Sequence, residues 1–129
     1  MSAADDKYKE TLSADAFKVC RLGATESPFS GKYYDHWQQG SYVCACCQDH
    51  LFLSSSKFQS GCGWPSFFEA IENKVSYLTD SSHGMQRTEI KCKACDSHLG
   101  HVFDDGPAPT FKRYCVNSLS LNFEASNDS

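Results

Sequence analysis

Residues 115–123 read Cys-Val-Asn-Ser-Leu-Ser-Leu-Asn-Phe, and this stretch has the clearest hydrophobic periodicity in the chain. Apolar residues at positions 119, 121 and 123 alternate with polar residues at positions 118, 120 and 122. Such alternation is typical of a strand with one buried face, because successive side chains point to opposite sides of a sheet. The stretch predicts a half-buried antiparallel strand.

Shorter runs of strand length precede it, rich in β-branched and aromatic residues, at 42–43, 51–53, 75–78 and 88–90. Glycine, proline and serine separate these runs, so the sequence predicts a mainly β domain. Before residue 40 the chain is first polar and compatible with one or two short helices, with Ser13 as a candidate cap, and then becomes irregular. We expect a single domain over 1–129, with a helical and coil wrap over 1–40, a β core over 41–123 and a flexible tail over 124–129.

The charge balance limits the possible partners. The chain of 129 residues has 12 Lys and Arg against 16 Asp and Glu, a net charge of −4. Nucleic-acid binding is not expected, because affinity for polyanions depends on Lys and Arg displacing counterions. No apolar run approaches the roughly 20 residues that span a bilayer, and the first residues lack the features of a secretory signal. We therefore expect a cytoplasmic protein without a membrane partner, or an organellar one if a targeting segment has been removed.

Two pairs of cysteines have the spacing of a metal site. Cys44 and Cys47 form one pair, and Cys92 and Cys95 form the other, each with two residues between the thiols. This spacing lets a tight turn direct both sulfurs at one ion, so two such turns predict a tetrahedral four-cysteine zinc site. Four protein ligands leave no open position, so the zinc would be structural.

A second ligand set competes with this one and consists of Cys92, Cys95, His98 and His101. Only two residues separate Cys95 from His98, whereas a finger of the two-cysteine, two-histidine type needs about a dozen at that point. The four-cysteine assignment is therefore favoured. Cys20 and Cys46 are interpreted as bystander thiols.

Cys62 and Cys115 remain as candidates for thiol chemistry. Cys62 is flanked by Gly61 and Gly63, which favours an accessible loop. Arg113 precedes Cys115 by two residues, so in a strand both side chains lie on one face, and the cation favours a thiolate. Cys115 is the better nucleophile candidate on this reasoning. The same sequence is also compatible with Cys115 as a small buried residue of the core.

His98 and His101 follow the second cysteine pair directly, which would hold their segment in place. Imidazoles are suited to proton transfer near neutral pH. Asp104 and Asp105 could orient them, or could simply form a solvated turn.

Taken together, these motifs closely resemble those of the B-type methionine-R-sulfoxide reductases, over about residues 8–123. The resemblance rests on the two cysteine pairs, on Ser-Gly-Cys-Gly-Trp-Pro-Ser-Phe at 60–67, on His-Leu-Gly-His-Val-Phe at 98–103 and on Arg-Tyr-Cys-Val-Asn-Ser at 113–118. It implies a β-tent-like fold of two antiparallel sheets with short N-terminal helices and a structural zinc held by four cysteines. It also implies thiol-dependent reduction of methionine-R-sulfoxide, free or in oxidised proteins, by a monomer that thioredoxin regenerates.

The resemblance also assigns roles to individual residues. Cys115 is similar to the nucleophile that becomes a sulfenic acid, and Cys62 to the resolving thiol that forms a disulfide with it. His101, with His98 as second choice, would protonate the sulfoxide oxygen. The remaining matches are polar residues around the nucleophile, namely Asp105, Arg113 and Asn117, and the substrate-contact candidates Trp64 and Phe103. Cys20 is an additional thiol that could compete with Cys62.

Two other functions are compatible with parts of the sequence. A zinc-stabilised binding module without catalytic activity would use the same scaffold to hold a peptide or a small ligand. A zinc hydrolase or deaminase would need an open ligand position, which the four-cysteine spacing does not leave.

Overall fold

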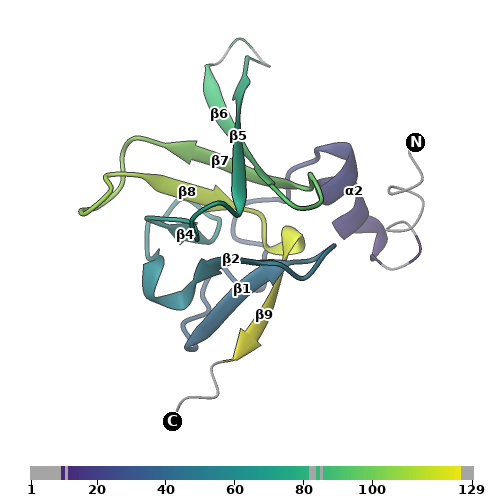
Figure 1. Cartoon of the computed structure of the whole chain (residues 1–129), viewed down its shortest axis with the longest axis horizontal. Coiled ribbons are helices and arrows are strands. Elements are labelled where there is room, and N and C mark those ends of the chain that lie inside the picture. The colour runs from purple at the N-terminus through teal and green to yellow at the C-terminus, as the bar shows by residue number, and fades with distance from the viewer. Residues whose placement is uncertain (1–9, 11, 82–83, 85, 126–129) are drawn as a thin grey trace.

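Two antiparallel sheets make up most of the molecule (Figure 1). The computed structural model describes residues 10, 12–81, 84 and 86–125. The three-stranded sheet has the order β2-β1-β9, with β1 (Gly40–Cys44), β2 (His50–Leu53) and β9 (Leu121–Ala125). The six-stranded sheet has the order β3-β4-β8-β7-β6-β5, and its strands are β3 (Lys57–Phe58), β4 (Ser66–Phe67), β5 (Val75–Asp80), β6 (Arg87–Cys92), β7 (His98–Phe103) and β8 (Arg113–Val116). The prediction of a mainly β fold with two antiparallel sheets is confirmed.

The helix α2 (Ala14–Leu22) precedes the sheets. It begins where the Ser13 side chain accepts a hydrogen bond from the backbone N–H of Ala16, and it ends at Gly23, whose φ of 77° suits glycine. The prediction of a further N-terminal helix and most of the predicted tail concern residues 1–9, 11 and 126–129, which lie outside the described residues. Within the described ranges, no helix has both the length and the apolar character needed to cross a membrane.

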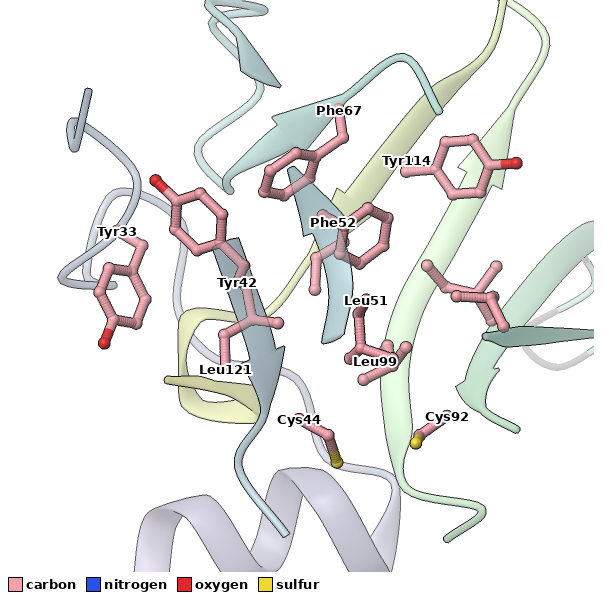
Figure 2. Close-up of a cluster of buried hydrophobic side chains, with 13 residues drawn as sticks. Tyr33, Tyr42, Cys44, Leu51, Phe52, Phe67, Cys92, Leu99, Tyr114 and Leu121 are labelled. Carbon is pink, nitrogen blue, oxygen red and sulfur yellow. The ribbon is translucent and has the colours of Figure 1, made fainter. Parts of the chain in front are cut away.

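The hydrophobic core lies between the two sheets, and aromatic rings from both contribute to it (Figure 2). Tyr42 and Phe52 come from the three-stranded sheet, whereas Phe67 and Tyr114 come from the six-stranded one. The rings of Phe52 and Phe67 stack with their centroids 4.4 Å apart. The sheets are therefore held face to face by side chains that meet across the core.

The predicted strand over 115–123 is wrong in its middle. β8 ends at Val116, the 3₁₀ turn η3 (Ser118–Ser120) follows, and β9 begins in the other sheet. Ser118 and Ser120 are buried, and both hydroxyls have partners. The Ser118 Oγ accepts from the backbone N–H of Tyr33 at 3.1 Å, and the Ser120 Oγ donates to the His98 carbonyl at 2.8 Å. Buried hydroxyls with such partners fit a crossing between sheets, which alternation alone does not reveal.

Gly100 allows β7 and β8 to approach closely next to Cys115. A Cβ atom at position 100 would lie 1.9 Å from the carbonyl oxygen of Cys115. No side chain fits in this space, so glycine is required where the strand with the histidines meets the strand with the thiol.

Candidate functional site

Four cysteine sulfurs come together at one end of the core. The Sγ atoms of Cys44, Cys47, Cys92 and Cys95 all lie within 4.8 Å of one another. Cys44 and Cys95 are 3.5 Å apart, and Cys47 and Cys92 are 3.6 Å apart. Ligands at 2.3 Å from a tetrahedral zinc would be about 3.8 Å apart, so the donor set fits a metal ion. Figure 2 shows the sulfurs of Cys44 and Cys92 facing one another next to α2.

The two turns that carry these cysteines have the same backbone geometry. The backbone N–H of Gln48 donates to the Cys44 carbonyl at 2.9 Å, and that of Asp96 donates to the Cys92 carbonyl at 2.8 Å. Gln48 and Asp96 both have positive φ, 65° and 66°. Each turn thus closes directly after its second cysteine, as a metal-binding pair requires. Across the described residues, the four cysteines form this cluster, and the alternative set with His98 and His101 does not.

Helix α2 packs against this cluster and brings the thiol of Cys20 near it, whereas the thiol of Cys46 comes from the turn between Cys44 and Cys47. The Nη1 of Arg21 donates to the carbonyl of Cys95 at 2.7 Å and to the Ser97 Oγ at 3.1 Å. Cys20 is buried, contacts the Leu119 carbonyl at 3.7 Å and lies against Cys46. Neither Cys20 nor Cys46 belongs to the four-sulfur cluster.

A second pair of thiols lies on the six-stranded sheet. The Sγ atoms of Cys62 and Cys115 are 3.0 Å apart, and both cysteines are free. Ser66 in β4 is directly opposite Cys115 in β8, so the loop just before β4 brings Cys62 to the thiol face. A cavity of about 530 Å³ opens here, lined in part by Cys62, Asp105 and Arg113. A disulfide has a bond length of about 2.05 Å, so only a small movement would bring the sulfurs to bonding distance once one of them is oxidised.

The contact between the two thiols shifts their pKa values in opposite directions. The hydrogen bond with Cys115 lowers the pKa of Cys62 to about 4, and Ser60 and Ser66 contribute further hydrogen bonds. The hydrogen bond with Cys62 and burial raise the pKa of Cys115, and the charge of Arg113 acts in the opposite direction. The first proton therefore leaves the pair easily and the second is retained, as expected for two strongly coupled groups. Because either sulfur can be the donor in this contact, a proton on one of them supports a thiolate on the other.

Arg113 connects this pair to an acidic residue. Its Nη1 is 3.1 Å from the Cys115 Sγ, and its Nε and Nη2 donate to the Asp105 carboxylate at 2.8 and 3.1 Å. The bond from Arg113 lowers the pKa of Asp105. The guanidinium also lies over the Phe103 ring, 4.5 Å from its centroid. Arg113 is thus held from two sides in a position that stabilises a thiolate at Cys115.

The two predicted histidines lie close together but do not contact the predicted aspartates. Their ring centroids are 5.8 Å apart. His98 binds Glu89 and His101 binds Asp80, whereas Asp104 pairs with Lys112 and Asp105 with Arg113. Burial lowers the pKa of His98, and Glu89 opposes that shift.

Sequence reasoning missed Asp80 and Glu89, because only the pairing of β5, β6 and β7 brings them to the histidines. The one available signal was the strand pattern at 88–90, which places Glu89 on one face of a strand without indicating what lies opposite. Local spacing had favoured Asp104 and Asp105 instead.

Asn117 is held by the backbone. Its Oδ1 accepts from the backbone N–H of Glu26 and its Nδ2 donates to the Leu99 carbonyl, both at 3.0 Å, and it is only 3% exposed. Trp64 donates from Nε1 to the carbonyl of the same Glu26 at 3.1 Å. The coil segment around residue 26 therefore ties the turn after β8 to the loop that carries Cys62.

The matching family model and relatives similar in sequence point to one family. A family model described as the SelR domain matches residues 12–125. A protein of Thioalkalivibrio sulfidiphilus described as peptide methionine sulfoxide reductase MsrB is 52% identical over 124 residues, which cover 95% of this chain and 90% of that relative. A protein of Teredinibacter turnerae with the same description is 55% identical over 121 residues, which cover 93% of this chain and 90% of that relative.

Among solved structures, the chain is similar to the Mis18 'Yippee-like' domain. The TM-score is 0.53 at 18% sequence identity, and the match covers 70% of this chain and 100% of the other. This likeness concerns the fold alone.

Proposed function

Because this chain belongs to the SelR-domain family of MsrB peptide methionine sulfoxide reductases, we propose that it reduces the R epimer of methionine sulfoxide with Cys115 as nucleophile and Cys62 as resolving thiol. The observation that carries the proposal is the contact of the two sulfurs at 3.0 Å with Arg113 at 3.1 Å from one of them. Because the chain belongs to a family of reductases, we favour an enzyme over the alternative of a binding module without catalytic activity.

The reaction begins at Cys115. Its thiolate attacks the sulfoxide sulfur while an acid protonates the sulfoxide oxygen, so the oxygen passes to Cys115 as a sulfenic acid and methionine leaves. His101, directly opposite Cys115 in the neighbouring strand, is the acid that we favour. Arg113 stabilises the thiolate before the attack.

Cys62 then resolves the sulfenic acid. Its sulfur attacks the Cys115 sulfur, the hydroxyl leaves as water, and a Cys62–Cys115 disulfide forms. An external dithiol donates two electrons and two protons to restore both thiols. Thioredoxin, whose potential is about −270 mV, is a suitable reductant.

The four-cysteine cluster is proposed to hold zinc through Cys44, Cys47, Cys92 and Cys95. Four thiolate ligands suit zinc and leave no open position, so the ion would stabilise the fold and take no part in the reaction. Arg21 and Ser97 would support the ligand Cys95 from the helix side.

The substrate contacts and the cellular setting are also proposals. Trp64 and Phe103 would contact the methionine side chain, and oxidised proteins are the substrate class that the descriptions of the relatives suggest. A monomer is the proposed oligomeric state. Eight free cysteines favour a reducing compartment such as the cytoplasm, and the net charge of −4 does not favour nucleic acid.

The proposed stereochemistry is tested by separating the two epimers. With dithiothreitol as reductant, the protein is expected to convert a peptide carrying methionine-R-sulfoxide and to leave the S epimer unchanged. A site that binds the methionine side chain in one orientation presents the sulfoxide oxygen of only one epimer to the acid. Chromatography of both epimers before and after incubation measures this. Conversion of the S epimer at a comparable rate would contradict the assignment.

Cys62→Ser is expected to separate the two reductants. Turnover with thioredoxin should fall by about a hundredfold or more, because the Cys115 sulfenic acid can no longer form the disulfide that thioredoxin attacks. Turnover with dithiothreitol should be partly retained, because a small thiol reaches the sulfenic acid directly.

Cys20→Ser is the matched control, since it removes a thiol outside this pair. Full retention of thioredoxin-dependent turnover in Cys62→Ser, together with its loss in Cys20→Ser, would move the resolving role to Cys20.

A further inference from the structure

Two carboxylates of the β5–β6 hairpin bind the two histidines of the site. Asp80 at the end of β5 places Oδ2 2.8 Å from the Nε2 of His101. Glu89 in β6 places Oε2 2.7 Å from the Nδ1 of His98. The side chains of both pairs are largely buried, at 14% and 19% exposure for His101 and Asp80 and at 7% and 21% for His98 and Glu89. These are therefore hydrogen-bonded pairs with restricted access to water rather than loose surface contacts.

The strand order puts each histidine between the thiol and a carboxylate. β7 lies between β8, which carries Cys115, and the hairpin of β6 and β5 (Figure 1). Glu89 is directly opposite His101, and His101 is directly opposite Cys115. Residues directly opposite one another in antiparallel strands share a face of the sheet. The carboxylates thus lie toward the hairpin and the nucleophile lies on the other side of the histidine strand.

A carboxylate that binds an imidazole determines which ring nitrogen carries the proton. An ionised carboxylate only accepts hydrogen bonds, so the nitrogen that contacts it must be an N–H. His101 then has its proton on Nε2 and His98 has its proton on Nδ1. The nitrogens left for other partners are Nδ1 of His101 and Nε2 of His98. The two histidines therefore hold opposite tautomers.

We propose that Asp80 and Glu89 are positioning residues of the reductase, which hold His101 with Nδ1 and His98 with Nε2 available to the sulfoxide oxygen. This inference rests on the proposed function, in which a histidine protonates that oxygen. In the imidazolium form of His101 the Nδ1–H gives its proton to the oxygen, and the ring returns to the neutral Nε2–H tautomer still bonded to Asp80. No further proton donor is needed within this step.

The ion pair of Asp80 supports this role. Asp80 is directly opposite Arg87 in the hairpin, and the Nη2 of Arg87 lies 3.3 Å from the same Oδ2 that contacts His101. Arg87 thus favours the ionised form of Asp80, which is the form that selects the Nε2–H tautomer. An Asp80–Arg87 ion pair that only joined β5 to β6 would not require the same Asp80 oxygen to contact His101 as well.

The experiment measures tautomers and kinetics in the same proteins. Nitrogen-15 NMR of the ring nitrogens in the wild type, above the pKa of both histidines, is expected to show His101 protonated at Nε2 and His98 at Nδ1. Asp80→Asn should alter the tautomer of His101 alone, because its amide can turn and donate, and Glu89→Gln should alter that of His98 alone. The same substitution in a buried aspartate–histidine pair keeps the geometry and selects the wrong tautomer.

The kinetic readout is the split between kcat and KM for the R-sulfoxide peptide. Asp80→Asn is expected to lower kcat by about 10-fold or more, since removing the hydrogen-bond partner of a metal-ligating histidine costs about 10- to 100-fold and an aspartate-to-asparagine change in a catalytic triad costs about 10⁴-fold, while KM changes little. Asp80→Glu should recover part of kcat and the wild-type tautomer. Asp104→Asn and Glu72→Gln are the matched controls, since Asp104 pairs with Lys112 and Glu72 is exposed; both should leave tautomers and kcat unchanged.

Three results would overturn the inference. These are the opposite tautomers in the wild type, a change of tautomer without loss of kcat in either variant, and a loss of kcat without a change of tautomer. The wild-type spectrum needs no variant, so a variant that fails to fold does not remove the test. A wild type with the expected tautomers that fails to convert the R epimer would instead overturn the proposed function, and with it the catalytic part of this inference.

Discussion

Cys115→Ser is expected to abolish reduction of methionine sulfoxide with every reductant, lowering kcat by on the order of a thousandfold or more, as when a catalytic nucleophile is removed. A serine hydroxyl at position 115 keeps a hydrogen bond to Arg113 but is not ionised near neutral pH, so it cannot attack the sulfoxide sulfur. Unlike Cys62→Ser, this variant should not be rescued by dithiothreitol.

The measurement is conversion of the R-sulfoxide peptide with dithiothreitol and, separately, with a thioredoxin system. Circular dichroism checks that the variant is folded, which is expected because oxygen replaces sulfur at a partly exposed position. Cys20→Ser, which removes a thiol outside the pair, should keep wild-type turnover. If Cys115→Ser retained more than a tenth of the activity, Cys62 would become the nucleophile, since it has the lower pKa of the two thiols.

Loss of the four-cysteine site is expected to have the largest effect on stability. Zinc bound by such sites contributes about 10–16 kcal/mol of apparent binding free energy, which is coupled to folding. Typical domains are stable by only about 5–15 kcal/mol. Cys92→Ser removes one ligand from a fully buried position, so we expect a protein that binds less than one zinc and lacks a cooperative thermal transition.

Metal content by atomic absorption and thermal unfolding by circular dichroism measure the two effects. Cys46→Ser is the matched control, because it removes a thiol from the same turn without removing a ligand. That variant should bind one zinc and unfold within a few degrees of the wild type. A Cys92→Ser protein, or a chelated wild type, that melts like the untreated wild type would contradict a structural role for the metal.

Local sequence patterns predicted two parts of the site well. The pairs Cys44–Cys47 and Cys92–Cys95 form the expected sulfur cluster, because two intervening residues determine how a tight turn directs its thiols. Arg113 and Cys115 lie on one face, because the period of a strand is two. The geometry of each cysteine pair and the shared face of Arg113 and Cys115 depend on residues a few positions apart, whereas the meeting of the two pairs depends on the tertiary fold.

The alternation over 115–123 shows where such patterns fail. It predicted one strand with Ser118 and Ser120 facing water, yet both hydroxyls are buried with partners from the coil before β1 and from β7. Hydrophobicity at single positions does not reveal that a distant carbonyl or N–H will pair with a hydroxyl. The crossing between sheets at η3 therefore could not be predicted from the sequence.

The sequence by itself determined the fold class and the two cysteine pairs, and it predicted the candidate nucleophile, because motif spacing and strand periodicity are local properties. Only the tertiary structure decided which groups meet. It brought Cys62 to 3.0 Å from Cys115 through the pairing of β4 with β8. It also gave the histidines Asp80 and Glu89 as partners through the pairing of β5, β6 and β7. Sheet register joins residues far apart in the chain, and that register depends on how the whole core packs.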